Sequence, residues 1–248
     1  MSRGERRSGA EPLRTAGERS EHERRVLITS GGTREPIDGV RFVTNFSSGV
    51  TGAALADAFG SAGWSVALVR SVDACRPADD RIEQVVFGSV ADLDATCARL
   101  LGERPFDAVL HAAAVGDYTV TAVVIDGVRH AAPLSGKLDS AKGLSVELSP
   151  SRKILPRLKT YGAGRPLLVG FKLTNGSSVA EQLAAVQAQL DGTDVDLVVH
   201  NDLTEIDHGA GRHVSTVYDR QGVVGRGTTN EELAAIMLDA LDRRMSTP

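Results

Sequence analysis

The stretch VLITSGGTREPIDGVRFVTNFSSG, residues 26–49, combines a strand, a glycine turn and the start of a helix. Its first four residues are apolar and β-prone, and they break into SGGT at 30–33. Its last three residues, SSG at 47–49, open an alanine-rich helix. Glycines allow close backbone approach, and the free N–H groups of a helix N-terminus favour negative charge. The stretch therefore predicts a phosphate-binding site.

From residue 26 onward the sequence alternates strand-like and helix-like segments. We expect strands at 26–29, 65–71, 82–88, 107–115, 167–173 and 196–202, and helices at 53–62, 90–101, 179–190 and 230–244. Runs of consecutive aliphatic residues between amphipathic helices favour a mostly parallel sheet that is covered on both faces. The pattern predicts an α/β, Rossmann-like, doubly wound fold with ligands at the carboxyl ends of the strands.

Three segments depart from this alternation. Residues 1–25 are rich in Arg, Glu, Ser and Gly, and we expect a disordered N-terminal extension there. Residues 118–149 contain short β-prone segments around a predicted hairpin turn at Asp126-Gly127, and residues 214–225 resemble a late hairpin. We therefore expect a single nucleotide-binding domain at 26–248 with two added β segments.

Composition excludes several classes of function. The net charge of −4 does not favour nucleic-acid binding, and no apolar run reaches membrane-spanning length. Cys75 and Cys97 lie 22 positions apart without a CxxC partner or clustered histidines, so two reduced thiols are expected rather than a disulfide or a metal pair. We expect a soluble, cytoplasmic protein.

Polar residues follow several of the predicted strands. Asp117 follows the strand at 107–115, Lys172 lies near the end of the strand at 167–173, and Asn201 lies near the end of the strand at 196–202. Each has a structural alternative, because Asp and Asn commonly cap turns and a lysine at a rim is commonly solvated. Their convergence on one sheet edge nevertheless indicates a functional site.

Five motifs together resemble the phosphopantothenoylcysteine synthetase family. In chain order they are GGTREPIDGVRFVTNFSSG (31–49), HAAAVGDY (111–118), GKL (136–138), VGFKL (169–173) and VVHND (198–202). Bacterial members of this family are often the carboxyl half of a protein whose amino half is a flavin-dependent decarboxylase. The length here leads us to expect a stand-alone synthetase.

The resemblance implies a ligase of coenzyme A biosynthesis that joins 4′-phosphopantothenate to L-cysteine. A nucleoside triphosphate, CTP or ATP, would give an acyl-nucleotidylate and pyrophosphate, and cysteine would then displace the nucleoside monophosphate. Mg²⁺ would share the phosphate charge. The family also implies a homodimer with shared active sites, in which the β segments at 118–149 and 214–225 form the interface.

The resemblance also implies four catalytic residues. Asn45 matches the asparagine that holds the acyl-nucleotidylate, where an amide donates a hydrogen bond without adding charge. Arg41 matches an arginine that reaches into the neighbouring subunit's site. Asp117 matches a position that contacts phosphopantothenate, and Lys137 matches a lysine on a flap that closes over phosphates.

Further candidates concern binding. Ala113 and Ala114 match positions that contact phosphopantothenate. The nucleotide candidates combine the predicted anion site with family positions: Gly31, Gly32, Thr33, Ser47, Ser48, Gly49, Gly52, Phe171, Lys172 and Asn201. No residue is assigned as a metal ligand.

The sequence departs from the bifunctional relatives in its basic residues. Val50-Thr51 stands where those relatives usually carry Lys-Met, and the predicted helix at 179–190 contains no Lys or Arg. Our hypothesis is that Lys172 replaces the missing positive charge. The choice between CTP and ATP stays open.

Two other functions are considered. A short-chain nicotinamide oxidoreductase requires a Tyr-x-x-x-Lys pair, but the residues four positions after Tyr118, Tyr161 and Tyr218 are Ala, Arg and Gly, and G-x-G-x-x-G is absent. A non-catalytic nucleotide-binding module is the second alternative, against which the presence of all four catalytic candidates argues.

Overall fold

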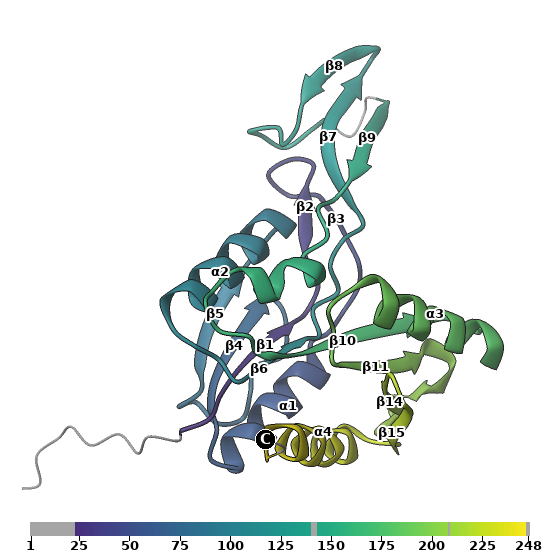
Figure 1. Cartoon of the computed structure of the whole chain (residues 1–248). Helices are drawn as coiled ribbons and strands as arrows, with labels where there is room; N and C mark the ends of the chain where they lie inside the picture. The colour runs from purple at the N-terminus through teal and green to yellow at the C-terminus, as the bar shows by residue number, and fades with distance from the viewer. Residues whose placement is uncertain (1–22, 140–142, 208, 247–248) are drawn as a thin grey trace, which may run out of the picture.

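The computed structural model describes residues 23–139, 143–207 and 209–246, and its centre is one large sheet (Figure 1). In the described part of the chain this sheet has eight strands in the order β15-β14-β11-β10-β6-β1-β4-β5. The parallel strands are β1 (Arg25–Ser30), β4 (Ser65–Ser71), β5 (Glu83–Phe87), β6 (Ala108–His111), β10 (Leu167–Thr174) and β11 (Leu197–Asp202). The antiparallel strands are β14 (Ser215–Asp219) and β15 (Gly222–Gly227). The predicted fold class is confirmed.

The strand order reverses between β1 and β6. From β1 the chain moves outward to β4 and β5, and it then returns to place β6 on the other side of β1. Such a reversal leaves a crevice outside the carboxyl ends of the two central strands, where ligands bind in folds of this type. The turn that follows β1 therefore starts at the switch point.

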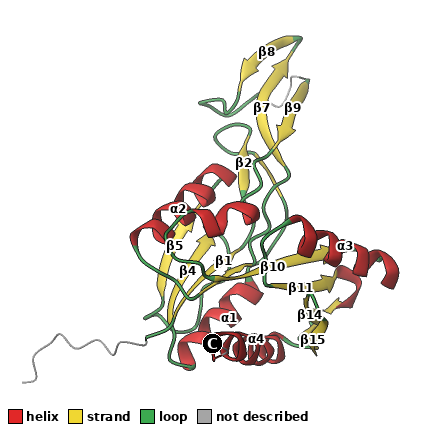
Figure 2. Cartoon of the chain, in the orientation of Figure 1, coloured by secondary structure: helices red, strands yellow, loops and turns green. Residues whose placement is uncertain are grey.

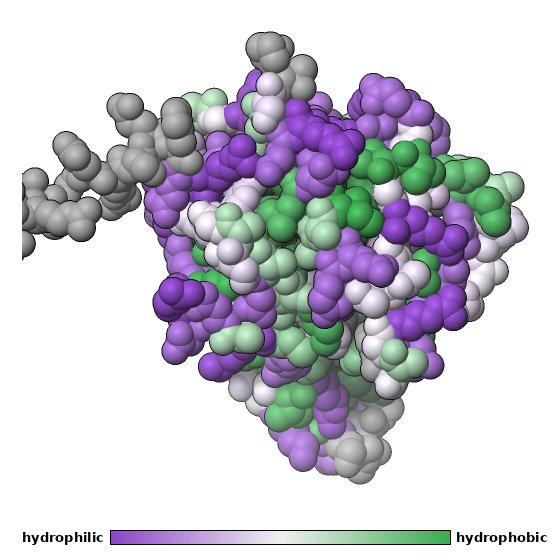
Figure 3. Space-filling model, turned by 90° about the horizontal axis from the view of Figure 1, so that it is seen from below, coloured by the Kyte–Doolittle hydropathy of each residue, from purple (hydrophilic) through white to green (hydrophobic). Residues whose placement is uncertain are grey.

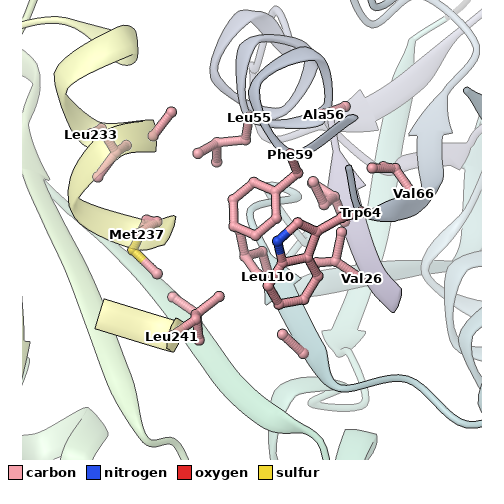
Figure 4. Close-up of a cluster of buried hydrophobic side chains, with 14 of the residues drawn as sticks. Val26, Leu55, Ala56, Phe59, Trp64, Val66, Leu110, Leu233, Met237 and Leu241 are labelled. Atoms are coloured by element: carbon pink, nitrogen blue, oxygen red, sulfur yellow. The ribbon is translucent and has the colours of Figure 1, made fainter. Parts of the chain in front are cut away.

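Helices cover both faces of the sheet (Figures 1 and 2). Helices α1 (Val50–Ser61) and α4 (Asn230–Ser246) pack on one face, and α2 (Val90–Glu103), α3 (Val179–Gly192) and the 3₁₀ helix η1 (Leu155–Thr160) pack on the other. Alternating residues of β1 serve the two faces, since Val26 and Ile28 belong to the first core and Leu27 to the second. In the first core the rings of Phe59 and Trp64 meet edge to face, with centroids 5.2 Å apart (Figure 4).

The helix N-termini differ in how they are capped. Ser89 and Ser178 form capping boxes with Asp92 and Glu181 at the starts of α2 and α3. Helix α1 begins at Val50, three residues earlier than expected, and carries no side-chain cap. Its N-cap is glycine with φ of 74°. A side chain is strained in that conformation, so glycine suits this position.

A three-stranded antiparallel sheet projects from the body of the molecule (Figure 1). It consists of β7 (Tyr118–Ile125), β8 (Val128–Ala131) and β9 (Leu144–Pro150), and we call it the extension. Asp126 and Gly127 have φ of 49° and 82°, which identifies the predicted two-residue hairpin turn. Both predicted β segments are therefore present, since residues 214–225 fall in β14 and β15.

Some sequence expectations need correction. The polar loop after β1 contains a small hairpin, β2 (Arg34–Pro36) with β3 (Phe42–Thr44), and a second hairpin pairs β12 (Ile206–Asp207) with β13 (Arg212–His213) after the short helix η2 (Leu203–Glu205). Strand β6 ends at His111 rather than at residue 115, because the chain leaves the sheet and Ala114 bridges to Gly32. The predicted disorder at 1–25 lies outside the described residues except for 23–25, where Arg25 starts β1.

Two further observations concern the surface and the thiols. Viewed from the side opposite the extension, hydrophobic residues gather near the middle of the face among hydrophilic ones (Figure 3). No helix in the described ranges is long and apolar enough to cross a membrane. Cys75 is exposed and Cys97 is buried, and both are free thiols as predicted.

Candidate active site

A cavity of about 230 Å³ lies where β1, β6, β10 and β11 end, and we call it the α1 pocket. None of the described residues that line it is Lys, Arg, Asp or Glu. Hydroxyl groups, backbone and aliphatic side chains form its walls instead. The lining residues are Ser30, Phe46, Ser47, Ser48, Gly49, Val50, Thr51, Gly52, Ala112, Ala113, Ala114, Phe171, Leu173, Asn201, Leu203, Ile206 and His213.

The N-terminus of α1 forms one wall of the α1 pocket. The N–H of Ala53 donates to the carbonyl of Gly49 at 3.0 Å, so the preceding N–H groups of this turn have no partner within the helix. No side chain caps this end. The uncapped turn and the helix dipole together supply positive potential to a pocket that has no cationic side chain of Lys or Arg.

The glycines near this wall make room for the chain itself. A Cβ on Gly52 would lie 2.3 Å from Ser30 Oγ, and a Cβ on Gly31 would lie 2.2 Å from Ser71 Oγ. A Cβ on Gly32 would lie 2.3 Å from the backbone oxygen of Asn45. Of these three, only Gly52 lines the pocket. The sequence interpretation assigns these glycines to nucleotide binding, which stays a prediction, and the structure shows that they also let neighbouring segments pack closely.

Thr33 stabilises the backbone of the site. It is fully buried, and its hydroxyl accepts a hydrogen bond of 2.8 Å from the N–H of Gly116. Its own N–H donates to Ala114 at 3.1 Å. Thr33 therefore holds the segment between β6 and Asp117 against the turn after β1, and a direct contact with a nucleotide stays a prediction.

Ala113 and Ala114 line the α1 pocket and are held from behind. The N–H of Ala113 donates to the hydroxyl of Thr29 at 3.1 Å, and that hydroxyl lies 2.9 Å from Nδ1 of His111. The Thr29 hydroxyl therefore joins the backbone of Ala113 to the ring of His111. Burial lowers the pKa of His111 to about 4, which agrees with a neutral ring.

A second group of polar residues lies beside the pocket. We call Asn45, Asp117, Lys153 and Lys172 the Asp117 group. Nζ of Lys153 lies 2.6 Å from Oδ1 of Asp117, and Nδ2 of Asn45 donates to the carbonyl of Val115 at 3.0 Å. The hydrogen bond from Lys153 is the main cause of the lowered pKa of Asp117, with smaller effects from Asn45 and Lys172.

Lys172 is separated from the other nucleotide candidates. Phe171 and Leu173, its neighbours on β10, line the α1 pocket. Successive side chains of a strand point to opposite faces, so Lys172 points to the other face of the sheet. Its charge acts on Asp117 and on His200 instead. The structure thus places Lys172 in the Asp117 group, while Ser47, Ser48, Gly49, Gly52, Phe171 and Asn201 line the pocket.

Arg41 and Lys137 belong to two loops that contact each other, since Arg41 donates a hydrogen bond to the carbonyl of Leu138 at 3.4 Å. Arg41 forms an ion pair of 2.6 Å with Asp38, whose carboxylate also accepts from the N–H groups of Val40 and Leu138. These bonds lower the pKa of Asp38 to about 2. Lys137 lines a shallow hollow with residues of β7 and β8. Neither residue lines the α1 pocket, so this chain alone does not bring them to it.

The sequence did not predict Lys153 or two residues that line the α1 pocket, Ile206 and His213. Lys153 follows β9 of the extension and does not lie at the end of a main-sheet strand, where ligand-binding residues are expected in this type of fold. Ile206 and His213 belong to the short strands β12 and β13, which the sequence did not predict. Among the described residues no three His, Cys, Asp or Glu side chains are grouped to hold a metal ion.

Known proteins share both the sequence and the fold. The coenzyme A biosynthesis bifunctional protein CoaBC of Thermococcus kodakarensis is 36% identical over 181 residues, which cover 73% of this chain and 41% of the relative. A crystal structure of the DNA/pantothenate metabolism flavoprotein from Streptococcus pneumoniae gives a TM-score of 0.78 at 24% identity, covering 89% of this chain and 99% of that one. A structure of a Cab2 mutant, H337A, in complex with phosphopantothenate-cysteine gives a TM-score of 0.68 at 20% identity, covering 90% and 88%.

These likenesses extend over most of the chain. This chain spans less than half the length of the CoaBC relative. At 20–24% identity the two solved structures establish the fold. The family described as the DNA/pantothenate metabolism flavoprotein C-terminal domain matches residues 21–243. This chain therefore belongs to the DNA/pantothenate metabolism flavoprotein C-terminal domain family.

Proposed function

We propose that this chain is a ligase that joins 4′-phosphopantothenate to L-cysteine in coenzyme A biosynthesis. The single observation that carries the proposal is the meeting of Asn45, Asp117 and the α1 pocket at the switch point of the sheet. The name of the CoaBC relative and the ligand of the Cab2 complex support this choice of substrates. A phosphate pocket next to a neutral amide suits a reaction between anions.

The reaction consists of two displacements. A carboxylate oxygen of phosphopantothenate attacks the α-phosphorus of CTP or ATP, and the bond from that phosphorus to the bridging oxygen breaks to release pyrophosphate. The amine of cysteine then attacks the acyl carbon, loses a proton and expels the nucleoside monophosphate. The protein contributes mainly by positioning both anions and neutralising their charge.

Asn45 orients the carboxylate and the mixed anhydride that forms from it. One Nδ2 proton is directed at Val115, and the other lies near Asp117. This second proton is the one that a substrate oxygen takes over, so Asn45 stabilises the acyl group without adding charge. The uncapped turn of α1 binds a phosphate group, in line with the nucleotide role proposed for Ser47, Gly49 and Gly52.

Arg41 and Lys137 are proposed to act across a homodimer. The extension exposes Tyr118, Val128 and Leu148 at 53, 57 and 45% of their surface. A projecting three-stranded sheet with exposed apolar side chains is stabilised by a partner surface, and a second copy provides one. Pairing of two extensions would bring Arg41 and Lys137 to the neighbouring subunit's reaction site.

Mg²⁺ is proposed to arrive on the nucleotide. It usually binds through substrate phosphates and one or two carboxylates. The described residues contain no cluster of acidic side chains that would form a magnesium site of their own. The side chains present therefore fit a metal carried by the phosphates and not one held by the protein alone.

The test is pyrophosphate release by the purified full chain. Release is expected only when phosphopantothenate and a nucleotide are both present, and the amide product, identified by mass, is expected only when cysteine is added. CTP and ATP are tested separately, which settles the nucleotide. Absence of release with both nucleotides would instead favour a non-catalytic binding module.

A further inference from the structure

The segment between β9 and η1 holds Lys153 against the reaction site. The N–H of Ser151 donates to the backbone oxygen of Asp117 at 2.8 Å, and the hydroxyls of Ser151 and Thr119 lie 2.9 Å apart. On the other side of Lys153, Ile154 is 1% exposed and belongs to the core under α2 and α3. The chain is thus anchored two residues before the lysine and one residue after it, and the Lys153 side chain reaches Asp117.

The ion pair between Lys153 and Asp117 is not explained by stability. The two side chains are 69% and 60% exposed, and an exposed pair contributes little to folding. Its position is the informative feature. The same carboxylate also interacts with the amide of Asn45 and with the charge of Lys172, so three elements far apart in sequence converge on Asp117.

An unpaired carboxylate at this point would oppose the proposed reaction. Phosphopantothenate and the nucleoside triphosphate are both anions, and the carboxylate of phosphopantothenate must approach Asn45. A free negative charge on Asp117 would repel that group and would compete with it for the second Nδ2 proton of Asn45. A cation on Asp117 removes both obstacles while leaving the carboxylate available to hydroxyl and amide donors.

We propose that Lys153 is a positioning residue of the reaction site, which holds the Asp117 carboxylate beside Asn45 and cancels its charge. The proposal rests on the ligase function proposed above and assigns a residue to that same site. Lys153 acts through Asp117 and takes no part in the bond-forming and bond-breaking steps. Lys172 contributes to the same field from the adjacent strand β10.

The activity test compares Lys153→Met with Arg152→Met. Arg152 is the adjacent residue and is 67% exposed, but it pairs with Asp94 on α2 and not with Asp117. We expect Lys153→Met to raise the KM for phosphopantothenate about tenfold, as loss of a hydrogen bond to a charged group predicts, and to move the acid limb of the kcat/KM profile to higher pH. Arg152→Met should match the wild type, and Lys153→Arg should restore most of the loss.

A second measurement does not depend on activity. The carboxyl ¹³C signal of Asp117 is titrated by NMR in the full chain without substrates, in the wild type and in Lys153→Met. The pKa of Asp117 should rise when the lysine is removed and should stay unchanged in Arg152→Met. An unchanged Asp117 pKa in Lys153→Met would overturn the positioning role even if the wild type is an active ligase, and failure of the wild type to release pyrophosphate would overturn the ligase function alone. Equal losses of activity in Lys153→Met and Arg152→Met would also overturn the positioning role of Lys153.

Discussion

The α1 pocket and the Asp117 group lie at the same edge of the sheet and are built from different materials. The pocket relies on backbone N–H groups, hydroxyls and glycines that let segments pack within a narrow space. The Asp117 group relies on exposed charged side chains that act on one carboxylate. Backbone geometry tolerates almost no change, whereas charges are screened and partly replaceable. Variants of the pocket should therefore fail sharply, and variants of the charges should fail by degrees.

Asn45→Asp is expected to have the largest effect, because Asn45 belongs to the Asp117 group and directly precedes Phe46 of the α1 pocket. The new carboxylate would face the carbonyl of Val115 and the carboxylate of Asp117, and it would repel the substrate. Loss of one donor to a developing oxyanion costs roughly 100- to 1000-fold in rate. We expect amide formation to fall by about 1000-fold while the free energy of unfolding changes little. Normal turnover of this variant, followed by product mass, would refute the role of Asn45.

Gly52→Ala tests the geometry of the pocket. The added Cβ would lie 2.3 Å from Oγ and 2.5 Å from Cβ of Ser30, so the start of α1 must move. A displacement of about 1 Å at a reaction site costs on the order of 100-fold in rate, and overpacking costs about 1–3 kcal/mol of stability.

Gly60→Ala is the matched control in the same helix. Its Cβ would meet only Ile82 at 3.5 Å, which is ordinary contact. Activity and urea unfolding are measured for both variants. If Gly52→Ala behaves like Gly60→Ala, the pocket does not depend on close packing at Ser30.

His111 makes the wall behind the pocket sensitive to pH. Its pKa is lowered to about 4 in the folded chain, while an unfolded histidine titrates near 6.5. Below pH 6.5 the unfolded state therefore binds a proton that the folded state refuses, and stability falls as the pH drops from 6.5 towards 4. Between pH 7 and 5 this difference amounts to about 2 kcal/mol.

The measurement is urea unfolding of the wild type and His111→Gln at both pH values. Glutamine still offers an acceptor to the Thr29 hydroxyl but does not titrate. The variant should lose about 2 kcal/mol less stability than the wild type on acidification. Equal losses would show that His111 is not buried as a neutral ring.

The sequence was sufficient where a local pattern determined the structure. Continuous aliphatic runs predicted the parallel strands, and Asp126-Gly127 predicted the hairpin turn. The hairpin of β2 and β3 could not be predicted in this way. Its three-residue strands are fixed by distant contacts, such as the N–H of Arg34 with Gly88 and the carboxylate of Glu35 with the N–H of Val90.

The candidate site shows the same division. Motifs located Asn45, Asp117 and much of the lining of the α1 pocket, and Asp117 and Asn201 also lie at the ends of predicted main-sheet strands. Lys153 meets Asp117 only through the register of β7 against β9, which pairs Tyr118 with Pro150 across a long excursion. The orientation of Lys172 was predictable from the sequence. Successive side chains of a strand point to opposite faces, so Lys172 points away from the face that Phe171 occupies.

Lys172→Gln should have the smallest effect, and it decides whether the two regions share one ligand. Our sequence hypothesis gave Lys172 the charge that relatives supply elsewhere for the nucleotide. Its position in the Asp117 group makes it a contributor through space, so we expect the nucleotide KM to rise about threefold and the increase to shrink at high salt. Lys172→Arg should retain the wild-type value. An unchanged nucleotide KM at low salt would refute the hypothesis that Lys172 replaces the missing charge. A far larger rise that salt does not reduce would mean that Lys172 contacts the nucleotide directly. The α1 pocket and the Asp117 group would then form one continuous binding site.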